Sequence, residues 1–141
     1  MSGRPRLNVR EQAAWMRNGL PRFRTEVSGR TLISRGKLQP TPLSREYSIV
    51  IQYEFGHRPR VFVPGGQLHR RVEGESIPHT YADDEPCLYY PKYGEWTSDM
   101  KIATSIVRWL ALWLMYYEIW SATGEWLGGG IEHKPAEEST Q

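Results

Sequence analysis

The chain has 141 residues, of which 39% are hydrophobic and 12% aromatic, so it has the length of one domain with its own core. It has one cysteine, which excludes an internal disulfide and favours a reducing, cytoplasmic setting. The net charge of +2 hides an asymmetry, because residues 1–45 hold ten basic and two acidic residues, a balance of +8, whereas the remainder has a balance of −6.

The first half of the chain predicts one helix and a small sheet. Residues 1–8 have no apolar run, so we expect a disordered start without a secretory signal. Residues 9–18 favour a short helix that ends at Gly19. Alternating or β-branched residues then predict strands over 23–27, 31–38, 47–55 and 60–64, separated by glycine and proline turns. Their spacing indicates a four-stranded antiparallel meander.

Residues 65–97 have no regular hydrophobic period and predict a long structured loop. Loops of this length inside a compact domain are uncommon and usually functional. The single cysteine, Cys87, lies in this loop between Pro86 and the aromatic residues that follow.

A long helix follows, with Ser98 or Asp99 as its expected N-cap and Gly124 as its end. Its predicted apolar stripe consists of Ile102, Ile106, Trp109, Trp113, Tyr116 and Trp120, widened by Leu110, Leu114 and Tyr117. Arg108 and Glu118 interrupt this segment, and a charge at mid-bilayer costs roughly 2.5–3.5 kcal/mol. We therefore expect a buried helix, not a membrane span.

Together these elements predict an α+β domain of two layers over residues 9–133, followed by a flexible tail over 134–141. Residues 125–133 are expected to fold back on the domain. The basic N-terminal third is either ordinary solvated surface or a docking face for an acidic partner. Binding to nucleic acid is not expected, because Trp15 and Phe23 are the only aromatic residues among those basic side chains.

Cys87 is either a buried apolar residue or a nucleophile. Three acids, Asp83, Asp84 and Glu85, precede it and would raise the pKa of its thiol by like-charge repulsion. A thiol with a raised pKa forms less of the thiolate nucleophile at neutral pH, which suits a protease poorly. It is acceptable in a carrier that holds an acyl group as a thioester. The same acids could orient or deprotonate an incoming lysine amine.

Two histidines are candidates for supporting Cys87. His79 lies eight residues before it and would organise the loop or donate to an oxyanion, and His133 lies near the end of the domain. A metal site formed by Cys87, His79 and His133 matches no regular ligand spacing, and no local signature supports a Cys-His hydrolase. We therefore expect neither a metal nor another cofactor.

The order of elements and three short motifs resemble the ubiquitin-conjugating (E2) family. The motifs are PHTY at residues 78–81, PCLY at 86–89 and EW at 95–96, followed by an aromatic helix and a late Glu132-His133 pair. In that family a His-Pro-Asn segment precedes the catalytic cysteine and a tryptophan follows it. The pattern is most similar to bacterial E2-like proteins of CBASS anti-phage operons, and the similarity covers roughly residues 9–133.

This resemblance implies an E2-like fold and a transthiolation role. Cys87 would accept a protein C-terminus as a thioester and pass it to a lysine, with Asp83 and Asp84 as candidates for handling the amine. The implied partners are a cGAS-like nucleotidyltransferase, whose C-terminus is the acyl donor in the relatives, and an E1-like activating protein. The alternative is an inactive E2-fold module that docks a partner through its basic N-terminal third.

The chain departs from the E2 pattern at the asparagine of the His-Pro-Asn segment, which is missing in that form. His79 or Tyr81 would take its place beside Cys87, and His133 would be a neighbour of the site. The sequence leaves open which of them does so.

Overall fold

The computed structural model describes residues 5–81, 85–88 and 96–128. The chain begins with a helix, α1 (Val9–Gly19), continues through four strands and ends with a long helix, α2 (Ile106–Thr123). The strands are β1 (Arg24–Ser28), β2 (Thr31–Leu38), β3 (Tyr47–Glu54) and β4 (Arg60–Phe62). They pair in the order β1-β2-β3-β4, each antiparallel to the next. The predicted α+β meander is therefore confirmed.

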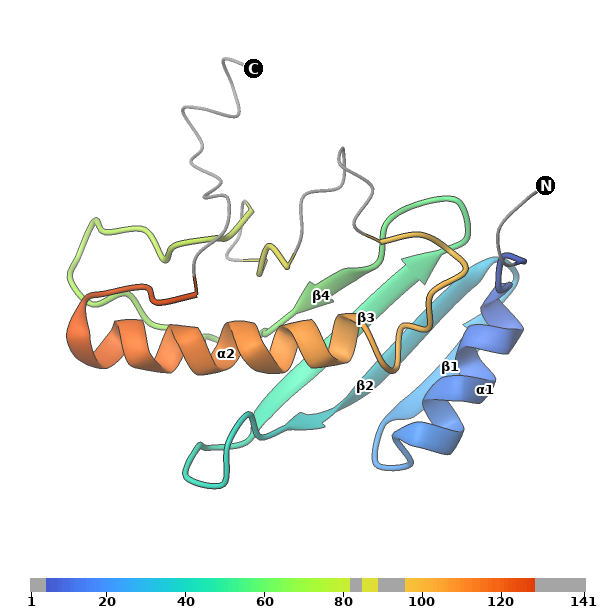
Figure 1. Ribbon diagram of the computed structural model, residues 1–141, viewed down its shortest axis with the longest axis horizontal. Coiled ribbons are helices and arrows are strands. Elements are labelled where there is room, and N and C mark those ends of the chain that lie inside the picture. The colour runs from blue at the N-terminus through green and yellow to red at the C-terminus, as the bar shows by residue number, and fades with distance from the viewer. Residues whose placement is uncertain (1–4, 82–84, 89–95, 129–141) are drawn as a thin grey trace, which may run out of the picture.

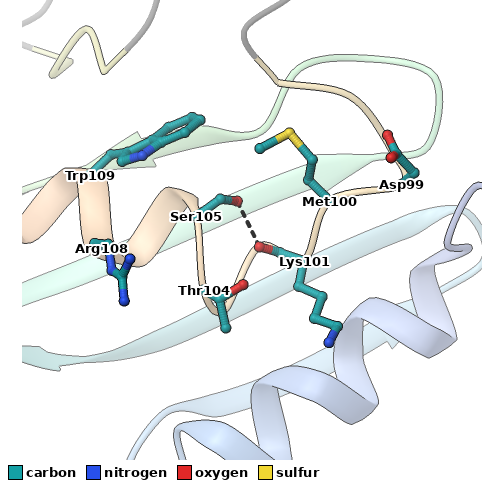
Figure 2. A pocket seen from close by; sticks show the side chains of 7 residues that line it. All are labelled: Asp99, Met100, Lys101, Thr104, Ser105, Arg108 and Trp109. Atoms are coloured by element: carbon teal, nitrogen blue, oxygen red, sulfur yellow. Dashed lines mark hydrogen bonds between the residues drawn. The ribbon is translucent and has the colours of Figure 1, made fainter. Parts of the chain in front are cut away.

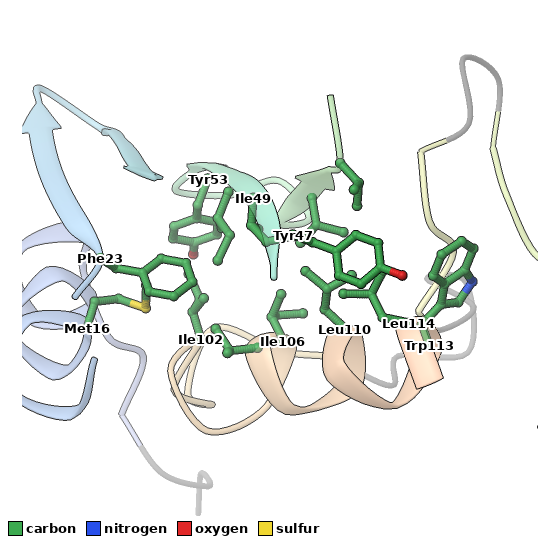
Figure 3. Packing of buried hydrophobic residues seen from close by; sticks show 14 of the residues in the cluster. Met16, Phe23, Tyr47, Ile49, Tyr53, Ile102, Ile106, Leu110, Trp113 and Leu114 are labelled. Atoms are coloured by element: carbon green, nitrogen blue, oxygen red, sulfur yellow. The ribbon is translucent and has the colours of Figure 1, made fainter. Parts of the chain in front are cut away.

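The two helices lie against the sheet, α2 across one face and α1 beside β1 and β2 (Figure 1). Burial alternates along β3, where Tyr47, Ile49, Ile51 and Tyr53 face the core. Figure 3 shows Tyr47, Ile49 and Tyr53 facing side chains of α2, with Met16 and Phe23 extending the core towards α1. Successive side chains of a strand point to opposite faces of the sheet, so a sheet with one buried face shows this alternation.

The N-terminus of α1 is fixed by a capping box. The side chain of Asn8 accepts a hydrogen bond from the amide of Glu11, and the Glu11 side chain accepts one from the amide of Asn8. Just before it, the amide of Leu7 donates to the carbonyl of Ser98 at 2.8 Å. Residues 7 and 8 are therefore tied to the fold although they precede the predicted domain boundary.

The predicted start of the long helix at Ser98 or Asp99 is wrong, because α2 begins at Ile106 with Ser105 as its N-cap. The side chain of Gln12, fully buried on α1, donates to the carbonyl of Met100 and accepts from the amide of Ile102. These bonds from another helix occupy backbone groups that a longer α2 would need for itself. Residues 98–105 therefore form turns, in which the hydroxyl of Ser105 donates to the carbonyl of Lys101 (Figure 2).

The predicted apolar stripe of the helix is right only in part. The buried residues of α2 are Ile106, Val107, Leu110, Trp113, Leu114, Tyr117 and Trp120. Trp109 and Tyr116, which were predicted in the centre of the stripe, are only half-buried. Since α2 is apolar on nearly every side, its residue spacing alone does not determine which face meets the sheet. The predicted end at Gly124 is confirmed, since that residue has the left-handed φ of 86° typical of a helix C-terminus.

Candidate active site around Cys87

Cys87 lies in the segment between β4 and α2, where the described residues form no helix or strand. The segments on either side of residues 82–84 run antiparallel and are joined through their main chains. The amide of Cys87 donates to the carbonyl of His79 at 2.9 Å, and the amide of Tyr81 donates to the carbonyl of Glu85 at 2.7 Å. An isolated bridge between Thr80 and Pro86 lies between these bonds. The backbone of Cys87 is thus held by the residues that precede it.

His79 connects this loop to the long helix. Its carbonyl also accepts a hydrogen bond from the indole nitrogen of Trp113, at 2.9 Å. Its φ of 56° is left-handed, a conformation that is uncommon outside glycine. Its ring packs on Trp126, with 5.0 Å between ring centroids. These contacts join the loop at His79 to α2 and to Trp126, which lies after α2, whereas residues 129–133 of the segment expected to fold back lie outside the described residues.

The acid nearest to Cys87 in sequence, Glu85, does not remain a free negative charge beside the thiol. Its side chain is only 2% exposed and is bound by two arginines, Arg58 at 3.0 Å and Arg60 at 2.9 Å. The hydrogen bond with Glu85 is the main cause that raises the pKa of Arg60, with a smaller contribution from the Glu85 charge. The negative charge of Glu85 is therefore balanced by two guanidinium groups.

Tyr81 is brought into the same cluster. The guanidinium of Arg58 lies over the ring of Tyr81, 4.4 Å from its centroid, while one of its nitrogens binds Glu85. Arg58 precedes β4 and Arg60 is its first residue, so the cluster attaches the loop to the sheet. A cation over an aromatic face contributes about 0.5–2 kcal/mol. We call Arg58, Arg60, Tyr81 and Glu85 the clamp.

The sequence did not reveal the clamp or the part played by Trp113. Arg58 and Arg60 precede Glu85 by more than twenty residues, and nothing in the local pattern pairs them. Trp113 was predicted as core, and it is buried, but it also donates the hydrogen bond that anchors His79. The one available signal was a pair of arginines flanking a proline just before a short strand.

Three predicted site residues, Asp83, Asp84 and His133, lie outside the described residues. Cys87 itself is buried, with 8% of its surface exposed, whereas His79 and Tyr81 are half-buried. No three residues of the types that bind metals cluster together within the described ranges. In the same ranges, no helix has both the length and the apolar character required to cross a membrane.

Comparison with curated protein sequences finds no match. A protein-family model described as Type II CBASS E2 protein matches residues 12–134. The match runs from α1 to beyond α2 and includes Cys87, His79 and the clamp. The α+β meander with its long C-terminal helix is the ubiquitin-conjugating-like arrangement that an E2 family implies. The chain therefore belongs to the Type II CBASS E2 protein family, and has an E2-like role in anti-phage signalling alongside other proteins of the CBASS operon.

Proposed function

We propose that the protein is an E2-like acyl carrier that holds a protein C-terminus as a thioester on Cys87 and transfers it to an amine. The observation that carries this proposal is the position of the chain's single cysteine. It lies within the residues matched to an E2 family, on a loop that is fixed by the carbonyl of His79 and by the clamp.

The first step is transthiolation. The thiolate of Cys87 attacks the carbonyl carbon of an activated C-terminus, which an E1-like protein presents as its own thioester. A new C–S bond forms to Cys87, the bond to the E1-like sulfur breaks, and that sulfur leaves as a thiolate. The proton of the Cys87 thiol is lost to a base or to water before attack.

The second step is aminolysis. A neutral amine attacks the thioester carbon, a C–N bond forms, and Cys87 leaves as a thiolate while the amine loses its proton. Asp83 and Asp84 are our candidates for orienting or deprotonating that amine. A carrier must also protect its thioester from water, and the low exposure of Cys87 suits this requirement.

Supporting roles follow from the contacts of the loop. His79 fixes the loop through its carbonyl, and Tyr81 is held by Arg58 beside the same backbone. We propose that His79 and Tyr81 together replace the asparagine of the E2 pattern as supports of the loop, with His133 as a further neighbour. The acyl donor is a cGAS-like nucleotidyltransferase, and its conjugation primes the anti-phage signal.

Intact mass of the protein co-expressed with the other proteins of its operon tests this proposal. We expect an adduct on the wild type that free thiols and hydroxylamine remove, and no adduct on Cys87→Ala. Cys87→Ser should give an oxyester, which reacts more slowly with free thiols. Thermal melting of both variants near that of the wild type would show that they remain folded.

If Cys87→Ala retains the adducts and the protection against phage, Cys87 is not a carrier. The protein would then act as an E2-fold module that binds a partner through its basic N-terminal third.

A further inference from the structure

The side of α2 that faces away from the sheet is mostly apolar. In Figure 1 no other helix or strand of the described residues lies over it. Leu112 is 44% exposed there, and Met115 and Ile119, which follow at spacings of three and four residues, are partly exposed. These spacings place the three side chains on one stripe of the helix, where a surface helix normally has polar residues. We call Leu112, Met115 and Ile119 the outer stripe.

The chain that follows α2 packs on another side of the helix. The ring of Trp126 lies 5.5 Å from that of Trp113 and 6.1 Å from that of Tyr116, measured between centroids. This contact covers the flank of α2 at Tyr116 but leaves Leu112 exposed. An exposed apolar stripe on a helix that is apolar nearly all round is typical of a surface that another molecule covers.

The loop between β2 and β3 adds a second exposed apolar side chain beside α2. The hydroxyl of Ser44 donates to the carboxylate of Glu118 on α2 at 2.7 Å, and the side chain of Gln39 donates to the carbonyl of Ser44, also at 2.7 Å. Leu43, next to Ser44 in this fixed loop, is 98% exposed. A leucine held open by a hydrogen-bonded loop loses little conformational freedom on contact with a partner.

The two charged residues of α2 lie towards its opposite ends. Arg108 is exposed in the first turn, and its side chain forms no hydrogen bond or ion pair within the described residues (Figure 2). The carboxylate of Glu118 accepts hydrogen bonds from the hydroxyls of Ser44 and Tyr47, but pairs with no cation of the described ranges. A carboxylate has about four acceptor sites, so Glu118 can also bind a guanidinium.

A second copy of α2 that runs in the opposite direction matches both the stripe and the charges. Arg108 and Glu118 lie five residues on either side of Trp113, and Ala111 and Met115 lie two residues on either side of it. A two-fold axis at this level therefore places each arginine opposite the partner's glutamate and each small alanine opposite the partner's larger methionine. Such an interface is self-complementary, as a two-fold dimer requires. Parallel helices would instead bring like charges together.

We propose that the protein forms a homodimer in which the outer stripes of two antiparallel α2 helices pack together, with Arg108 of each subunit facing Glu118 of the partner subunit. Leu43 borders this contact and adds apolar surface to it. A second copy supplies the apolar stripe, the base and the acid at the required spacing. The proposal does not depend on the chemistry of Cys87, and Cys87→Ala should dimerise as the wild type does.

Sedimentation velocity of the full chain tests the proposal. We expect the mass of the wild type to rise from monomer towards dimer between about 1 and 300 μM protein, the range of a weak homodimer. Leu112→Glu places a charge in an apolar contact and should raise the Kd of dimerisation at least about tenfold. Its melting temperature at low concentration should stay near that of the wild type, because Leu112 is exposed in one subunit. The matched control is Val72→Glu, at another exposed apolar residue, which should dimerise as the wild type does.

A second pair of variants tests the charges. Arg108→Glu places like charges opposite each other and should raise the Kd of dimerisation about tenfold. Arg24→Glu makes the same change at an exposed position of β1 and should leave this Kd unchanged.

Disulfide cross-linking in a Cys87→Ser background identifies the direction of the two helices. Leu112→Cys lies close to the expected two-fold axis and should link two subunits under mild oxidation. Thr123→Cys lies ten residues from the level of Trp113, so its two copies are about 30 Å apart at 1.5 Å per residue and should not link. Parallel helices would link both variants.

Three results would overturn the proposal. The first is a monomeric mass up to the highest concentration, the second is equal dimerisation of Leu112→Glu and the wild type, and the third is a disulfide between two copies of Thr123→Cys. If the chain stays monomeric and Leu112→Glu loses binding to another protein of the operon, the outer stripe is the docking surface of that protein and the homodimer is wrong.

Discussion

The amide of Cys87 and the carbonyl of His79 form a 2.9 Å hydrogen bond, and the indole of Trp113 donates to that same carbonyl. A carbonyl oxygen has two lone pairs, so one peptide group can fix both the cysteine and the long helix. The backbone of Cys87 is therefore linked through His79 to a residue of α2 that lies far from it in sequence.

Replacing Trp113 by phenylalanine should loosen the loop of Cys87. The variant loses a hydrogen bond of about 1 kcal/mol, which corresponds to a factor of about five in a local opening equilibrium. We expect faster alkylation of Cys87 by iodoacetamide under native conditions, by roughly that factor.

The control for this variant is Trp120→Phe, which makes the same change in volume at another buried position of α2. Both variants should lose about 1–3 kcal/mol of stability through the cavity they leave. Equal rates of Cys87 alkylation in the two variants would show that the bond to His79 does not position the thiol.

Glu85→Gln should weaken the clamp and lower the yield of the Cys87 adduct. It removes the charge that pairs with two arginines, whose side chains are 31% and 50% exposed and can be partly solvated instead. We therefore expect a loss of about 1–3 kcal/mol, below the cost of breaking a fully buried pair. Urea unfolding measures the stability, and intact mass measures the adduct.

The matched control is Glu54→Gln, since Glu54 has an exposed side chain and a longer contact of 3.9 Å with His57. That variant should change neither stability nor adduct yield. If Glu85→Gln forms the adduct at the rate of the wild type, the clamp is not a positioning device.

The sheet could be predicted from the sequence because alternating or β-branched residues mark each strand, and nearby glycine and proline residues mark the turns. The strand over residues 31–38 has the bounds that its residues and turns predict, and β3 differs by one residue at its end. The start of α2 could not be predicted, since it depends on bonds from Gln12, which lies ninety residues before Ile102. The clamp was missed for the same reason: Glu85 meets Arg58 and Arg60 only in the folded chain.

Gln12→Leu tests the explanation for the late start of α2. It leaves the carbonyl of Met100 and the amide of Ile102 without their partner. Each unsatisfied buried group costs about 1–3 kcal/mol, so for the two groups together we expect a loss of about 2–6 kcal/mol in urea unfolding. Gln52→Leu, an exposed position on β3, is the control and should stay within about 0.5 kcal/mol of the wild type. A small loss in Gln12→Leu would mean that other contacts fix residues 98–105.

Stability should fall as the pH rises above about 10, the ordinary pKa of tyrosine. Burial, and then the hydrogen bond to Glu118, raise the pKa of Tyr47 well above its usual range. The unfolded chain therefore loses this proton before the folded chain does, which favours unfolding, whereas the full stabilisation is present below pH 10. Tyr47→Phe should show a shallower decline between about pH 10 and pH 11.5 in urea unfolding. An identical decline in both proteins would contradict a raised pKa at this residue.

Peptide mass spectrometry of the adduct formed with the operon proteins, digested at a pH low enough to preserve thioesters, identifies the residue that carries the acyl donor. We expect the C-terminal residues of the acyl donor on the peptide that contains Cys87, and we expect hydroxylamine to remove them. A donor C-terminus found only on lysines, with Cys87 always recovered unmodified and with the same yield from Cys87→Ala, would contradict this expectation.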